Sequence, residues 1–92
     1  MKLEILTPET KLFLGEASYV QIPGSDGQLG VLDNHAPLIT SLGAGSIRIK
    51  AEGTPEEVKE ERLGSAVDCD YLFEVNGGTV EILNNNVVIL AE

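Results

Sequence analysis

The residues with the most chemical potential in this chain are one histidine, His35, and one cysteine, Cys69. A cysteine whose thiol proton passes to a nearby histidine can act as a nucleophile. The sequence shows no third group that would orient the histidine and no motif typical of a nucleophile. A small hydrolase built on Cys69 and His35 therefore stays an alternative, and we expect a chain without catalytic residues.

Three glycines, Gly24, Gly27 and Gly30, recur at every third position and could suggest a phosphate-binding loop. Such loops hold phosphate with backbone N–H groups at the start of a helix, usually beside a lysine. Here no lysine follows and the next segment has the pattern of a strand. The aspartates lack the spacing of a calcium-binding loop, and one histidine cannot form a two-histidine metal site. We expect no cofactor and no metal.

The composition restricts the partners and the setting. The chain has 92 residues, 15 acidic and 6 basic side chains, and a formal net charge of −9. Such a charge repels nucleic acid and anionic lipid, so a charged partner should be basic where it makes contact. A single cysteine rules out an internal disulfide. No stretch approaches the roughly 18 apolar residues of a membrane span. We expect one soluble domain over residues 1–92, in the cytoplasm and not inserted in a membrane.

Most of the chain has the pattern of short strands separated by turn residues. Asn76-Gly77-Gly78 predicts a hairpin that joins the strands on either side of it. Short strands at close spacing indicate a β-sandwich or barrel. The expected strands cover residues 2–6, 11–14, 16–22, 29–32, 38–42, 46–50, 71–75, 79–83 and 87–90.

Residues 51–70 differ from the rest, with seven acidic and two basic side chains. Thr54, Pro55 and Glu57 match the start of a helix, as N-cap, first-turn proline and capping-box partner, and Gly64 could end it. The alternative is a mobile acidic hairpin tip, because few apolar residues are available to hold so short a helix. The sequence leaves both possibilities open.

Two segments are apolar on both alternating faces. Residues 87–90 are one, and residues 30–32 together with 38–39 are the other. A free two-layer sandwich needs only one apolar face for each strand. These strands are therefore either buried centrally or covered on the outside by another protein.

The stretch from Pro23 to Leu32, PGSDGQLGVL, followed by NHAPL at residues 34–38, closely resembles the signature region of ATP synthase epsilon subunits. LEILTPE at residues 3–9, IRI at 47–49 and NVVILA at 86–91 match further segments of that family. The resemblance implies a flattened antiparallel β-sandwich of about ten short strands. It also implies a non-catalytic rotor subunit, joining gamma to the c-ring and coupling proton flow to ATP synthesis in the alpha/beta hexamer. Its place would be peripheral, on the cytoplasmic face of the inner membrane.

Individual positions can be matched to the family. Gln28 and His35 correspond to the edge that faces the c-ring, and Thr7 and Thr40 to the side that meets gamma. Gly24, Gly27, Gly30 and Pro37 are expected to form the turns of that edge. The main alternative function is a free-standing β-sandwich module that binds another protein.

The sequence also departs from the family. Asp33 stands where a proline is common, which should loosen its turn. The two-helix C-terminal hairpin that family members commonly carry is not part of a sequence that stops at Glu92. We therefore expect no helical domain and no ATP binding or braking through it. The chain is either naturally short or cut at the domain boundary.

Overall fold

The computed structural model describes residues 1–59, 64 and 68–92. In this part of the chain nine strands form one curled sheet, and there is no helix. No helix that could cross a membrane is therefore found among the described residues. The strands are β1 (Lys2–Leu6), β2 (Lys11–Gly24), β3 (Gly27–Leu32), β4 (Leu38–Leu42), β5 (Gly45–Ala51), β6 (Glu57–Val58), β7 (Tyr71–Val75), β8 (Gly78–Leu83) and β9 (Asn86–Ala91).

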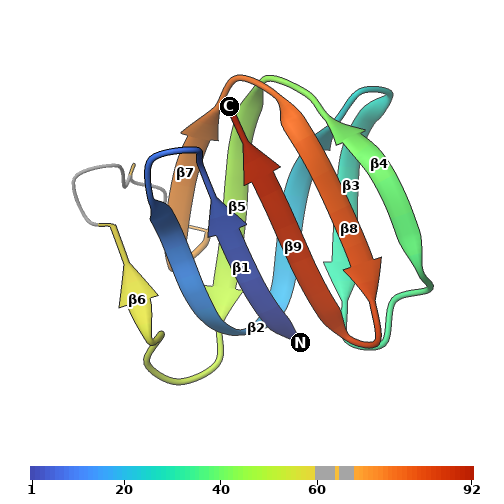
Figure 1. Ribbon diagram of the computed structural model, residues 1–92. Coiled ribbons are helices and arrows are strands. Elements are labelled where there is room, and N and C mark those ends of the chain that lie inside the picture. The colour runs from blue at the N-terminus through green and yellow to red at the C-terminus, as the bar shows by residue number, and fades with distance from the viewer. Residues whose placement is uncertain (60–63, 65–67) are drawn as a thin grey trace.

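The sheet folds over into two layers, as Figure 1 shows. The front layer contains β1, β9, β8 and β4, and the back layer contains β3, the second half of β2, β5 and β7. All pairings are antiparallel except β1 with β9, which run parallel. The predicted flattened β-sandwich is confirmed, with one parallel pair that the sequence did not predict.

Strand β2 belongs to both layers. Its first half pairs with β1 and its second half with β3 and β5. Two bulges make this possible: Leu12 has no partner in β1, and Ser18 has none in β5. A bulge adds one residue and bends the strand, which lets Leu12 and Phe13 both turn inward. The prediction of two separate strands was wrong.

The interruption was expected at Gly15, which instead lies inside β2. A Cβ atom there would come within 2.8 Å of the Cβ of Pro55. Glycine at this position permits close approach of the neighbouring segment and does not end the strand.

The core lies between the layers and consists of inward-facing aliphatic side chains and two phenylalanines. The rings of Phe13 and Phe73 meet edge to face at 6.4 Å, and Tyr71 lies 5.5 Å from Phe13. Each strand thus contributes alternate residues to one interior, as a two-layer sandwich requires. Its fully buried members include Leu3, Ile5, Leu12, Phe13, Val20, Ile22, Val31, Ile47, Ile49, Phe73 and Ile89.

The hairpin predicted at Asn76-Gly77-Gly78 does not form. Strand β7 pairs with β5 in the back layer, and β8 pairs with β4 and β9 in the front layer. Gly77 and Gly78 have φ angles of 137° and 139°, which carry the chain from one layer to the other. Strands β8 and β9 instead form a two-residue hairpin at Asn84 and Asn85, both with positive φ, as a type I′ turn requires.

The helix considered from Thr54 is not present over the described residues. Glu57 and Val58 are extended as β6 and pair with Leu14 and Phe13 of β2. Packing of Val58 against the core outweighs the local signals for a helix start. Residues 60–63 and 65–67, where the rest of this helix or the acidic tip would lie, are outside the described residues.

Candidate docking surfaces

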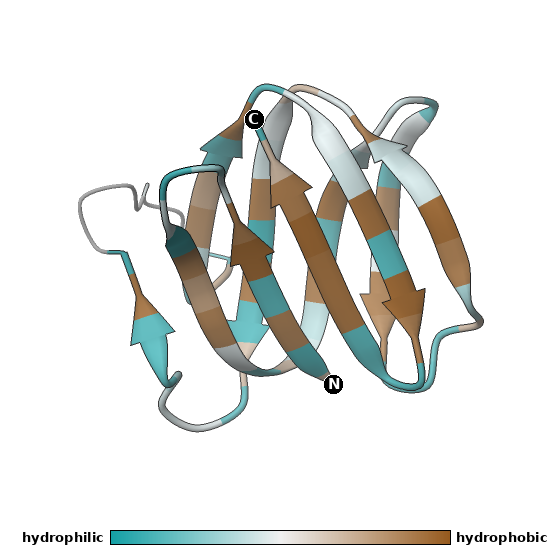
Figure 2. Ribbon diagram, in the orientation of Figure 1, coloured by the Kyte–Doolittle hydropathy of each residue, from teal (hydrophilic) through white to brown (hydrophobic). Residues whose placement is uncertain are grey.

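The outer side of the front layer, here called the front face, carries a cluster of apolar side chains. Ile39 of β4 is 75% exposed, Leu90 of β9 50% and Leu83 of β8 48%. Val88 and Leu6 are half-buried beside them. Figure 2 shows that hydrophobic residues occupy β9 over most of its length. Successive residues of a strand point to opposite sides, so both sides of β9 are apolar. Central burial of this strand is therefore excluded, since one of its apolar sides faces outward.

Strand register brings these side chains together. Glu81 of β8 lies between its partners Ile39 in β4 and Val88 in β9. Leu90 pairs with Thr79 across β8 and with Leu6 across β1. The apolar residues therefore surround one carboxylate near the middle of the front face.

The front face is hollowed on both sides of Ile39. One shallow hollow is lined by Ile39, Leu83 and Pro37, and a second by Ile39, Val88 and Leu90. Glu81 lines both of them. The Ile39 side chain thus projects between two hollows, and side chains of a partner can fill these hollows.

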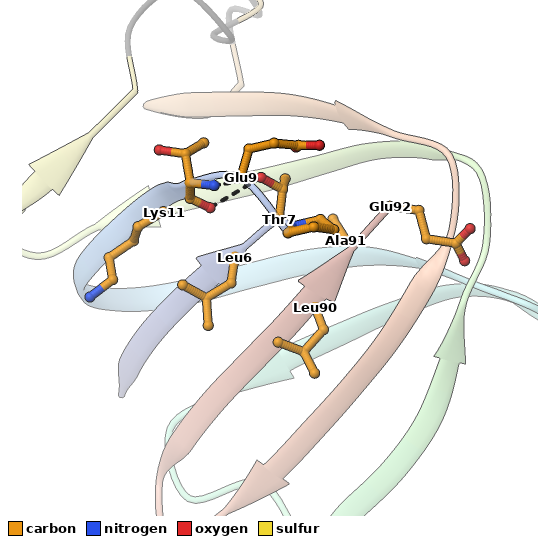
Figure 3. A pocket seen from close by; sticks show the side chains of 9 residues that line it. Leu6, Thr7, Glu9, Lys11, Leu90, Ala91 and Glu92 are labelled. Atoms are coloured by element: carbon orange, nitrogen blue, oxygen red, sulfur yellow. Dashed lines mark hydrogen bonds between the residues drawn. The ribbon is translucent and has the colours of Figure 1, made fainter.

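A third hollow lies at the upper end of β1 and β9, where Thr7 meets Leu6 and Leu90 (Figure 3). Thr7 Oγ1 donates to the carbonyl of Thr10 and accepts from its N–H, both at 3.1 Å. These bonds fix the turn between β1 and β2, so Thr7 has a structural role besides its place in this hollow.

The outer side of the back layer, here called the back face, is polar. Arg48 Nη1 donates to Asp68 Oδ1 at 2.8 Å, and Ser46 Oγ donates to Glu74 Oε1 at 2.5 Å. Leu32, 63% exposed, is its one large exposed aliphatic side chain in the described residues. Two pairs of polar side chains on the back face thus bind each other.

A third surface is the edge between β3 and β4. Strand β3 pairs only with β2, and β4 meets β2 at one position, Leu42 with Gly24. The gap holds a shallow hollow that Gln28 and Thr40 both line. The edge is therefore open. Gln28 lies at one end of it, beside the turn between β2 and β3, and His35 lies at the other end, in the turn between β3 and β4.

Two contacts tie the turn between β3 and β4 to the rest of the molecule. The ammonium of Met1 donates to Asp33 Oδ1 at 2.5 Å, and the Asn34 N–H donates to Asn85 Oδ1 at 2.7 Å. The hydrogen bond from the Met1 ammonium holds the pKa of the Asp33 carboxyl below its usual value of 3.8. Asp33 therefore anchors the turn, contrary to the expectation that it loosens it.

The side chain of His35 is directed toward its own turn. Its Nδ1 lies 2.7 Å from the carbonyl oxygen of Ala36, so Nδ1 carries the proton and Nε2 stays available to a partner.

The other predicted residues do not group by the partner to which they were assigned. Gln28 and Thr40, assigned to opposite partners, line the same hollow, whereas Thr7 lies apart on the front face. Gly24 and Gly27 flank the two-residue turn as predicted, and Pro37 precedes β4. Gly30 is not a turn residue: it lies within β3, where a Cβ atom would come within 2.9 Å of the Tyr19 hydroxyl.

Sequence reasoning did not single out Ile39, Leu90 or Glu81. The signal was present, because segments that are apolar on both alternating faces contain Ile39 and Leu90. Glu81 carries no such signal, since an acidic residue on a strand is ordinarily solvated.

The residues considered for chemistry lie apart. Cys69 precedes β7, and β5 and β2 separate that strand from β3, next to which His35 lies. Across the described ranges, no three acidic, histidine or cysteine side chains come together as metal ligands would.

Comparison with protein families gives a match over the whole chain. Residues 1–92 match the family described as ATP synthase, Delta/Epsilon chain, beta-sandwich domain. An ATP synthase epsilon chain of Pelotomaculum thermopropionicum is 42% identical over 90 residues, which cover 98% of this chain and 56% of that protein. One from Herminiimonas arsenicoxydans is 36% identical over 92 residues, covering 100% and 56%. The chain thus spans little more than half the length of these relatives.

Solved structures share the fold. A chain in the central stalk/c-ring structure of Tetrahymena thermophila mitochondrial ATP synthase superposes with a TM-score of 0.71 at 17% identity, covering 99% of this chain and 62% of that one. A chain of the Euglena gracilis mitochondrial ATP synthase gives 0.73 at 17% identity, covering 97% and 48%. At this identity the likeness concerns the fold alone.

Proposed function

Because this chain belongs to the ATP synthase delta/epsilon family through its β-sandwich domain, we propose that it is the epsilon subunit of an F-type, proton-transporting ATP synthase. In this role it is part of the rotating central stalk and joins gamma to the c-ring. Proton flow through the ring would then be coupled, by way of gamma, to ATP synthesis in the alpha/beta hexamer.

The observation that carries the proposal is the exposed apolar front face. Ile39, Leu83 and Leu90 contribute little to the core of the chain, because they face away from it. Large exposed apolar clusters on soluble proteins mark sites of protein association. We assign this face to gamma, in keeping with the position of Thr7 at its upper end.

The open edge between β3 and β4 is assigned to the c-ring. Gln28 and His35 lie at its two ends, and Nε2 of His35 is free to accept a hydrogen bond from a polar loop. The edge and the front face share β4, so two partners can contact the domain side by side. Thr40, which lines the hollow at this edge, lies near the boundary between the two assigned surfaces.

The role requires no reaction by the chain itself. Shape-matched contacts transmit torque, and a subunit of this kind needs neither a catalytic residue nor a cofactor. The chain would be held at the cytoplasmic face of the inner membrane through its partners, with no segment of its own in the lipid.

The test is reconstitution with purified gamma and c-ring from the same source. The chain is expected to co-elute with gamma and the c-ring, in an amount equal to that of gamma. The Ile39→Asp variant is expected not to co-elute with them. If the chain instead bound a peptide and neither gamma nor the ring, a free-standing binding module would be the better description.

A further inference from the structure

Glu81 occupies an unusual place on the front face. It is exposed and lies between Ile39 and Val88, and the hollows on both sides of Ile39 include it. Within residues 1–59, 64 and 68–92 it forms no hydrogen bond and no ion pair. The neighbouring acid on this face, Glu4, is already paired with Lys11 Nζ at 3.1 Å.

Covering the apolar cluster would also cover this carboxylate. An ionised group removed from water is strongly unfavourable unless an opposite charge or hydrogen-bond donors replace the lost hydration. A purely apolar partner surface would therefore be rejected at Glu81, even though it matched Ile39 and Leu90. The face selects for its partner's charge as well as for its shape.

We propose that Glu81 determines the specificity of the front face by pairing with an arginine or lysine of the partner. The inference rests on the proposed function, in which gamma covers this face, and it adds the chemistry of the contact. The matching segment of gamma would present apolar side chains to the hollows around Ile39 and one basic side chain between them.

The same carboxylate disfavours a second copy of this chain as the occupant. In a two-fold contact centred on the apolar cluster, the two copies of Glu81 would lie near the axis and approach each other without a compensating charge. Each copy also has a formal net charge of −9, which adds repulsion between copies.

The test compares four forms of the chain, the parent, Glu81→Gln, Glu52→Gln and Ile39→Asp, in binding to purified gamma by titration calorimetry at low and high salt. Glu81→Gln keeps the size of the side chain and removes its charge. Loss of one partner from a desolvated charge pair is expected to weaken binding by roughly 30-fold or more. Glu52→Gln removes the same charge from an exposed position beyond β5 and is expected to change binding by less than about threefold.

The outcomes separate the inference from the proposed function. If Glu81→Gln bound gamma as tightly as the parent chain while Ile39→Asp did not bind, the face would be right and the charge pairing wrong. If the parent chain itself did not bind gamma, the proposed function would fail. If sedimentation showed the parent chain as a dimer that Ile39→Asp disperses, the occupant would be a second copy and the inference would be overturned.

Discussion

The front and back faces of this sandwich follow the same rule of alternation and yet differ in what they expose. On the back face two pairs of polar side chains bind each other, Arg48 with Asp68 and Ser46 with Glu74. On the front face Ile39 and Leu90 stand in water with no partner from the chain. The inward-facing residues form the core, so a cluster of apolar side chains on an outer face indicates assembly.

The largest expected effect comes from breaking the crossing between the layers. A Cβ atom at Gly78 would come within 1.9 Å of the Leu90 carbonyl oxygen, at a φ of 139°. Gly78→Ala should cost about 3 kcal/mol or more of unfolding free energy, and both faces would be lost together. Gly27→Ala is the control. The φ of Gly27 is 122°, and no atom would lie within 4 Å of the added Cβ. This substitution should cost only about 1–2 kcal/mol of unfolding free energy. Equal denaturation midpoints would contradict this account.

Placing one aspartate on each face tests whether the front face, and not the back face, binds gamma. Ile39→Asp on the front face should weaken gamma binding by roughly 100-fold, because it places an unpaired carboxylate in the contact. Leu32→Asp on the back face should leave gamma binding within about threefold. Both residues are exposed, at 75% and 63%, so thermal unfolding should change little for either. Equal loss of binding would show that the faces do not differ as described.

A smaller effect is expected at the contact of Asp33 with the Met1 ammonium, which links the end of β3 to the start of the front layer. Since the pKa of Asp33 is lowered in the folded chain, the stability it contributes is present above the ordinary value of 3.8. It is lost as the pH falls through the lower folded value.

Asp33→Asn should therefore lower the melting temperature at pH 7, and the difference from the parent chain should shrink in acid. Asp26→Asn, in the turn at the other end of β3, removes the same charge and should not reproduce the fall in melting temperature at pH 7. A difference for Asp33→Asn that persisted at pH 2 would argue against the contact.

The smallest effect is expected on the back face. Arg48 and Asp68 are both substantially exposed, with side chains 36% and 66% accessible, and such pairs contribute less than about 1 kcal/mol. Arg48→Ala should lower the unfolding free energy by less than about 0.5 kcal/mol and leave gamma binding unchanged. A loss of binding would show that the back face also takes part in assembly.

The sequence was sufficient to predict most of the strands, but not the continuity of β2, the short strand β6 or how the strands pair. Alternation located β1, β4 and β7 with their observed bounds, because each strand carries its own pattern. The turn at Asn76-Gly77 has the local composition of a hairpin, but Phe73 and Val75 pack in the back layer and Val80 and Ile82 in the front. Tertiary packing decides that choice, and no local signal reports it.

For the candidate site, the sequence limited the possibilities without choosing between them. Apolar residues on both sides of β9 predicted either central burial or a partner, and only the register with β1 and β8 shows that Leu90 faces outward. The role of Asp33 was also beyond sequence, since the Met1 ammonium approaches it only in the folded chain. Gln28 and His35 lie at the two ends of one open edge, and their assignment to the c-ring stays a prediction.

The course of β2 has a mechanical consequence. One unbroken backbone is hydrogen-bonded first to β1 and then to β3 and β5, so no plane divides the domain into halves that could slip past each other. A force applied to either face is therefore transmitted to both layers through β2. Unfolding of the domain should occur as one cooperative event. In hydrogen exchange, the amides at both ends of this strand should open together, at the free energy of complete unfolding.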